Sequence, residues 1–169
     1  QFDSHSDTWD TYFGGFKYTH GTPFRRAIEE NLIDPKKYVI LGLRGGLYDP
    51  EDLRWAIEQG VTIITTDKFY EIGIKETIKI VIDILADTPT YFTFDIDGID
   101  PTYAPGTGTP EVGGINVREA QILIRELSHL NFVGADVVEV SPPFDVNNIT
   151  SLVAATIAFE ILCTMTKTN

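Results

Sequence analysis

Short runs of β-branched and aromatic residues alternate along this chain with longer amphipathic stretches, and this alternation strongly limits the folds open to it. We expect strands over residues 38–43, 61–66, 91–96 and 132–140, and helices over residues 23–31, 50–59, 73–87, 116–130 and 151–166. The strand runs are almost continuously apolar, which is typical of parallel strands covered on both faces. The repeated strand–helix–strand order predicts an α/β fold, a three-layer α/β/α sandwich around a mostly parallel sheet.

Several of the expected helices carry recognisable start signals. Pro23 and Pro50 stand at first helical positions, and Asn116 with Glu119 three residues later forms a potential capping box. No linker, low-complexity tract or internal repeat interrupts the pattern. We therefore expect a single domain over residues 1–169.

The charge balance excludes two classes of partner. The 13 Lys and Arg residues stand against 25 Asp and Glu residues, for a formal charge of −12. Nucleic acids and anionic membrane surfaces are bound largely through cationic side chains, so neither is expected as a partner. Cys163 is the only cysteine, no apolar run is long enough to span a membrane, and we expect a cytoplasmic protein. The chain opens on Gln1, and the strand-like character of the next residue suggests a piece of a longer protein.

A first polar cluster, Asp3-Ser4-His5-Ser6-Asp7, lies close to the start of the chain. On an extended backbone, Asp3, His5 and Asp7 would share one face. Two carboxylates and an imidazole crowded together favour a bound cation, because their charges would otherwise repel and desolvate poorly. A solvated polar loop is the alternative interpretation.

A second pair of carboxylates, Asp95 and Asp97, follows the apolar strand run Tyr91-Phe92-Thr93-Phe94. Either aspartate could instead cap a turn or a short helix. In parallel sheets, ligands bind at the carboxyl ends of strands, so both clusters are expected at one sheet edge. Four carboxylates and one histidine are more than a single ion needs, and a ligand set without thiolate suits Mn²⁺ better than structural Zn²⁺. The sequence thus favours a binuclear metal centre.

Three further features lie near these ligands. The Gly- and Pro-rich stretch 100–114 directly follows the second pair and is expected to wall the metal pocket. Glu139 is predicted inside an apolar strand, where an unpaired carboxylate is costly. Arg44 follows the strand at 38–43 and is expected to pair near the site.

The segments DSHSDT, HGTPFRRA, FDIDGIDPTYAPGTGTPEVGG and DVVEVSPPFD resemble, in order, the successive motifs of the ureohydrolase family, which includes arginase, agmatinase and guanidinobutyrase. The resemblance covers essentially the whole chain. HGTPFRRA and GLRGGLYDPEDLRWA are more similar to agmatinase and guanidinobutyrase than to arginase itself. The family resemblance implies an arginase-like fold and a small guanidino substrate such as agmatine or 4-guanidinobutyrate, hydrolysed to urea and an amine.

The resemblance also implies a set of metal ligands. Two Mn²⁺ ions would share a bridging hydroxide, with Asp3 and Asp95 as bridging carboxylates. Asp7 would complete the shell of one ion, and His5 with Asp97 that of the other. Such ions lower the pKa of bound water and so supply a nucleophile at neutral pH.

Catalytic and substrate-binding roles follow from the same resemblance. His20 matches a histidine that would shuttle protons and contact the substrate. Glu139 would be a bidentate partner of the substrate guanidinium. Asp97 would also help to pass a proton to the leaving amine. Family members form trimers or hexamers, so a homo-oligomer is expected.

The chain departs from the family pattern at its start. A Gly-Gly-Asp-His element that carries a sixth metal ligand does not precede Gln1, so the ion held by Asp7 is expected to bind more weakly. The chain reads as the C-terminal portion of a ureohydrolase catalytic domain. Two alternatives stay open: a non-catalytic metal-binding or scaffold fragment of such an enzyme, and arginase or formimidoylglutamase activity on the same metal chemistry.

Overall fold

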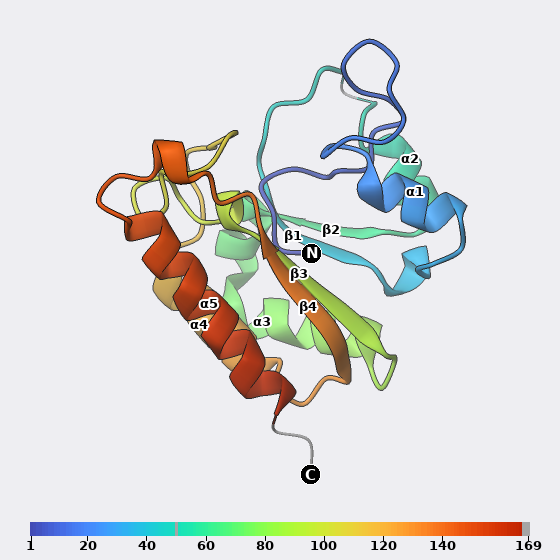
Figure 1. The fold of residues 1–169 in the computed structure, drawn as a ribbon. Helices are drawn as coiled ribbons and strands as arrows, with labels where there is room; N and C mark the ends of the chain where they lie inside the picture. Colours follow the sequence, from blue (N-terminus) through green and yellow to red (C-terminus); the bar gives the residue numbers. More distant parts are fainter. Residues whose placement is uncertain (50, 167–169) are drawn as a thin grey trace.

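The computed structural model describes residues 1–49 and 51–166 and has an α/β architecture built on parallel strands (Figure 1). Its strands are β1 (Val39–Leu43), β2 (Thr62–Thr65), β3 (Thr90–Asp95) and β4 (Phe132–Val138). β1 pairs with β2 and β3 pairs with β4, both in parallel. The prediction of four parallel strands in an α/β fold is confirmed.

The two strand pairs are joined through the first residues of the chain. Phe2 forms parallel bridges to Leu41 of β1 and Phe94 of β3. Its N–H donates to Thr93 O at 3.0 Å and its carbonyl accepts from the N–H of Asp95 at 2.8 Å. The backbone at Phe2 therefore occupies a strand position between β1 and β3, as the apolar start of the sequence suggested, and it delivers the following polar residues to the edge of the sheet.

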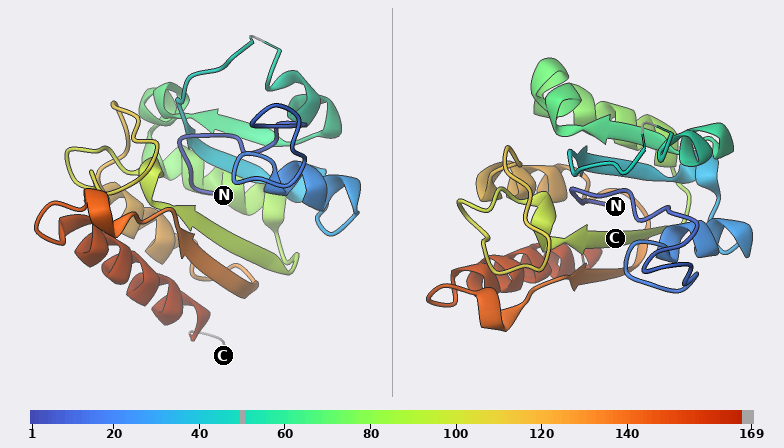
Figure 2. Two further views of the ribbon diagram at one scale, coloured as in Figure 1. Left: turned by 45° about the horizontal axis from the view of Figure 1, so that its top comes forward. Right: turned by 90° about the horizontal axis from the view of Figure 1, so that it is seen from above.

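Helices flank this sheet, most of them on one side (Figures 1 and 2). They are α1 (Pro23–Glu29), α2 (Arg54–Gln59), α3 (Thr66–Leu85), α4 (Val117–Glu126) and α5 (Ile149–Met165), with short 3₁₀ turns η1 (Pro35–Lys37), η2 (Ile96–Gly98) and η3 (Pro142–Phe144). α3 packs on β1 and β2, while α4 and α5 pack on each other and α5 packs on β4. Within the described residues, none of the helices is long and apolar enough to cross a lipid bilayer.

Two apolar clusters fill the opposite faces of β1. The larger one contains Val39, Leu41 and Phe94 together with residues of α3, α4 and α5. The smaller one contains Ile40 with residues of α1 and α2, because alternate strand positions point to opposite faces. The predicted three-layer sandwich therefore exists around β1 and β2. On β3 the side chain of Tyr91 is 53% exposed, so that part of the sheet is less completely covered.

Several helices begin or end at residues other than the predicted ones. The helix expected at residue 73 begins at Thr66, because the Thr65 side chain accepts the N–H of Lys68; Gly73, at φ 81°, interrupts it. The helix expected over 50–59 begins at Arg54, and Pro50 lies outside the described residues. The helix expected over 116–130 ends at Glu126, but its capping box is confirmed.

Candidate metal centre

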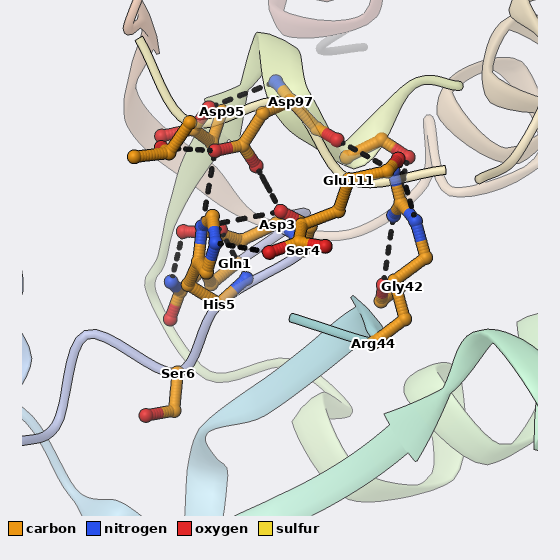
Figure 3. A network of polar contacts seen from close by, with 12 residues as sticks. Gln1, Asp3, Ser4, His5, Ser6, Gly42, Arg44, Asp95, Asp97 and Glu111 are labelled. Carbon is orange, nitrogen blue, oxygen red and sulfur yellow. Dashed lines mark hydrogen bonds and ion pairs between the residues drawn. The ribbon is translucent and has the colours of Figure 1, made fainter. Parts of the chain in front are cut away.

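Four of the predicted ligands come from two neighbouring segments at the carboxyl edge of the sheet (Figure 3). Asp3 and His5 lie where the chain leaves its place between β1 and β3. Asp95 is the last residue of β3, and Asp97 lies in η2 directly after it. The side chains of Asp3, Asp95 and Asp97 are almost completely buried. The prediction that both clusters lie at one edge of the sheet agrees with this placement.

Asp3, His5 and Asp97 form the compact part of the cluster. Each of the three offers one ligand atom, and these atoms all lie within 4.8 Å of one another. Nδ1 of His5 is 3.0 Å from Oδ2 of Asp97 and 3.6 Å from Oδ1 of Asp3. A divalent cation between these three groups would be held by two carboxylates and one imidazole.

The backbone route to this arrangement is not the extended one that we predicted. The chain bends at Ser4 and His5, and the N–H of His5 donates to Oδ1 of Asp3 at 2.6 Å. Asp7 has φ 51°, in the left-handed region. A short polar loop thus folds back on its own carboxylate, as Asp often allows, instead of continuing the strand.

Electrostatics place Asp7 and Asp95 with the same cluster. Burial, followed by repulsion from Asp3, raises the pKa of Asp7 to about 8 and that of Asp95 to about 10. Burial also raises the pKa of Asp3, with a further contribution from Asp97. These carboxyls are close enough to oppose one another's ionisation, and a divalent cation would relieve that repulsion.

Asp95 also plays the capping role that was the alternative interpretation. Its Oδ1 accepts the N–H of Asp97 at 2.9 Å, at the start of η2. This hydrogen bond uses one carboxylate oxygen. Capping and metal binding are therefore compatible at this position, since a carboxylate has several acceptor sites.

His5 and Asp97 form the ion pair of the cluster. Burial disfavours the charged imidazole, but hydrogen bonds to Asp3 and Asp97 prevail and raise the pKa of His5 to about 11. Burial likewise disfavours the Asp97 carboxylate, yet hydrogen bonds from His5 and Ser4 lower its pKa. These contacts favour a proton on His5 beside the Asp97 carboxylate. A metal ion would take its place, because metal-bound imidazole must be neutral.

Two residues that the sequence analysis did not single out support Asp97. Oγ of Ser4 donates to Oδ1 of Asp97 at 2.7 Å, and the Ser4 N–H donates to the same oxygen at 3.1 Å. Oγ1 of Thr109 donates to Oδ2 at 3.3 Å. Thr109 belongs to the Gly- and Pro-rich stretch, so its sequence position offered a signal; the contribution of Ser4 depends on the bend in the chain.

A cavity of about 360 Å³ opens beside the cluster. His5 and Asp7 line one part of it, and His20 lines another; Trp9, Tyr12, Gly21, Gly46, Leu47, Tyr48, Thr109, Pro110 and Glu111 complete its wall. The expectation that the stretch 100–114 walls the pocket is confirmed. The His20 ring packs edge-on against Tyr12, with ring centres 5.2 Å apart. The structure therefore brings His20 to the same cavity as two of the predicted ligands.

Glu139 does not lie where the sequence predicted it. β4 ends at Val138, and Glu139 follows as an exposed residue with φ 63°. The prediction of a carboxylate inside an apolar strand is wrong, because the chain turns out of the sheet one residue earlier. Repulsion from Glu139 still contributes, as the smallest of the causes, to the raised pKa of Asp7.

The fold and the site thus define an α/β protein with a candidate metal site of carboxylates and an imidazole at the carboxyl edge of its parallel sheet. Comparison with known proteins gives the family: residues 1–164 match the Arginase family, and the chain belongs to it. It is 53% identical to guanidinopropionase of Pseudomonas aeruginosa over 166 residues, which cover 98% of this chain and 52% of that protein. It is 42% identical over 163 residues to guanidinobutyrase of the same species, covering 96% and 51%.

Solved structures agree with this assignment. The proclavaminate amidinohydrolase of Streptomyces clavuligerus superposes with a TM-score of 0.91 at 44% identity, covering 96% of this chain and 54% of that one. The chain spans about half the length of the curated relatives that it matches. The family resemblance and the arginase-like fold are confirmed.

Proposed function

We propose that this chain carries the metal-binding catalytic region of an amidinohydrolase that converts a small guanidino compound to urea and an amine. The observation that carries the proposal is the cluster of Asp3, His5 and Asp97, because its His5 lines a cavity that His20 also lines. Membership of the Arginase family supports it, as do relatives named for hydrolysis of guanidino compounds.

The residues present fit Mn²⁺. The donor set is rich in carboxylate oxygen and contains one imidazole. Burial and then repulsion from Asp3 raise the pKa of Asp7 and Asp95, and a bound cation would stabilise their ionised forms. Asp3, His5, Asp7, Asp95 and Asp97 would hold the ions. When bound, Mn²⁺ supplies Lewis-acid activation of the attacking water.

The protein side chains then bind the substrate and move protons. Anionic carboxylates around the cavity attract the cationic guanidinium group, and Glu139 would accept two of its N–H groups. Asp97 would take a proton from the attacking water and pass it to the amine nitrogen as the C–N bond breaks. His20, at the cavity wall, would exchange with solvent the other proton that the attacking water loses.

The aromatic part of the cavity wall suits the rest of the substrate. Trp9, Tyr12 and Tyr48 stand together there, with the ring centres of Trp9 and Tyr48 5.1 Å apart. Aromatic faces attract guanidinium groups and cover methylene chains. A short guanidino acid or guanidino amine is therefore the proposed substrate class, with 3-guanidinopropionate, 4-guanidinobutyrate and agmatine as the compounds to compare.

Urea release by the Mn²⁺-loaded chain tests the proposal, with EDTA as the metal-free control. Each of the three compounds, and arginine, is offered at equal concentration. Metal-dependent urea from one of them is the expected result, and Asp95→Asn should abolish it, whereas the exposed control Asp87→Asn should not. Mn²⁺ binding without urea from any compound would contradict catalysis by this chain and favour the metal-binding fragment.

Two accompanying expectations stay predictions. A homo-oligomer, trimeric or hexameric, follows from the family resemblance alone and can be measured by light scattering. A cytoplasmic location can be tested by fractionation of cells that express the parent protein.

A further inference from the structure

Arg44 makes an unusually large set of contacts for a side chain that follows a strand (Figure 3). Within residues 1–49 and 51–166, its guanidinium donates to backbone carbonyl oxygens, at Gly42 (3.1 Å), Asp97 (2.8 Å), Gly98 (3.2 Å), Ile99 (3.4 Å), Glu111 (2.7 and 3.1 Å) and Val112 (3.2 Å). These carbonyls belong to three separate segments: the end of β1, the turn that carries Asp97, and the loop that walls the cavity. One side chain thus ties together all three.

The Arg44 guanidinium packs closely against the backbone of Gly114. A Cβ atom at Gly114 would lie 2.8 Å from Cζ of Arg44 and 2.6 Å from the backbone nitrogen of Asp100, so no larger residue fits there without displacement. The Asp100 carboxylate accepts the N–H groups of Gly113 and Gly114 at 2.8 and 2.9 Å. The loop is therefore anchored on both sides of the guanidinium.

The loop that Arg44 holds brings a carboxylate to a metal ligand. Oε1 of Glu111 lies 3.6 Å from Nε2 of His5, while Nδ1 of the same ring lies 3.0 Å from Asp97. The imidazole is thus placed between two carboxylates, one on each nitrogen. An imidazole that binds metal through one nitrogen is oriented, and made a stronger ligand, by an acceptor at the other.

We propose that Arg44 and Glu111 are positioning residues of the metal centre. Arg44 fixes the Asp97 turn and the 100–114 stretch relative to each other, and Glu111 thereby holds the His5 ring in its ligating orientation. This inference rests on the proposed function, because it assumes that His5 binds a metal ion. It assigns Arg44 a purpose beyond the local pairing that the sequence suggested.

Lysine cannot replace Arg44 in this role. A guanidinium presents five N–H groups in a rigid plane, whereas an ammonium offers three donors from a single atom. Carbonyls on three segments cannot all be reached from one nitrogen, so Arg44→Lys keeps the charge and loses the link.

The test measures Mn²⁺ affinity of the full chain, from the electron paramagnetic resonance signal of the free ion, and the melting temperature in EDTA. Glu111→Gln should weaken Mn²⁺ binding about 10-fold or more. Its melting temperature in EDTA should change little, because the 3.6 Å contact between Glu111 and His5 is long and partly exposed. Arg44→Lys and Gly114→Ala should weaken Mn²⁺ binding as well. Glu58→Gln and Arg54→Lys, both exposed on α2, are the matched controls.

A double variant separates positioning from general stability. If Arg44 acts through Glu111, adding Arg44→Lys to Glu111→Gln should weaken Mn²⁺ binding by less than the product of the two single effects. Multiplicative effects would overturn the link between the two residues, and a Glu111→Gln affinity within twofold of wild type would overturn the role of Glu111. Failure of the wild-type chain to bind Mn²⁺ would overturn this inference and the proposed function together. Mn²⁺ binding without urea release contradicts only the proposed function.

Discussion

Replacing Asp95 by asparagine should stabilise the metal-free protein while removing its response to Mn²⁺. The carboxyl group of Asp95 is 3% exposed, and burial with repulsion from Asp3 raises its pKa from 3.8 to about 10. Asparagine has nearly the same shape, and its side-chain oxygen can still accept the N–H of Asp97. The substitution therefore removes the ionisable group and keeps the cap.

The structure sets the size and the pH dependence of this effect. A carboxyl whose pKa is higher in the folded state favours folding when protonated, so the free energy of unfolding falls as pH rises from about 4 towards about 10. The free energy of unfolding falls by about 1.4 kcal/mol per pH unit. At pH 7 that of the wild-type protein is therefore lower, by at most about 4 kcal/mol, than with a neutral side chain at this position. Asp95→Asn should recover much of this, or about 10 °C in melting temperature at 2–4 °C per kcal/mol. The gain should disappear near pH 4.

Thermal unfolding followed by circular dichroism between pH 4 and 9 measures this, in EDTA and again with excess Mn²⁺. In EDTA, Asp95→Asn should melt above wild type at pH 7, and the exposed control Asp87→Asn should melt with wild type. With Mn²⁺ the wild-type melting temperature should rise and that of Asp95→Asn should not. A variant that is less stable than wild type in EDTA at every pH would refute the reasoning, because Asp95 would then be a stabilising cap and not a strained ligand.

Three further predictions concern the substrate groups and the core. Glu139→Gln should leave Mn²⁺ affinity unchanged and raise KM for the guanidino substrate at least 10-fold; an unchanged KM would remove Glu139 from substrate binding. His20→Asn should lower kcat about 10²-fold with full metal content by atomic absorption, and a normal kcat would assign the proton transfer elsewhere. Phe94→Ala, which removes a fully buried ring stacked on Phe2 with centres 4.3 Å apart, should cost about 3–5 kcal/mol in urea unfolding. Leu152→Ala, at an exposed position on α5, should change stability by less than about 0.5 kcal/mol.

Much of the fold could be predicted because its signals are local. The continuous apolar runs located all four strands to within two residues at each end, since buried parallel strands need apolar side chains on both faces. The Asn116–Glu119 capping box is equally local, and it formed as expected. The early start of α3 had a local signal too, in Thr65, but the helical periodicity is interrupted at Gly73 and points to a later start.

The types of ligand in the metal centre were also readable from the sequence, because carboxylates and an imidazole at strand ends are costly without a cation. What the sequence by itself determined was therefore the class of fold, the edge of the sheet where the candidate site lies and the types of side chain gathered there. The spacing of Asp3, His5 and Asp7 suggested convergence on an extended chain, yet the chain bends there and Asp7 has a positive φ. Backbone angles of this kind depend on the hydrogen bonds that a folded loop makes.

Only the tertiary structure decided how the ligands are supported and where Glu139 lies. β4 ends at Val138, so Glu139 lies just outside the sheet. Arg44 and Glu111 are 67 residues apart, and their link through a backbone carbonyl leaves no trace in side-chain pattern or spacing. Every residue carries a backbone carbonyl whatever its side chain. The sequence therefore identifies the donor, Arg44, but not the carbonyl groups that accept from it. The assembly of three distant segments around one guanidinium is a property of the packed chain.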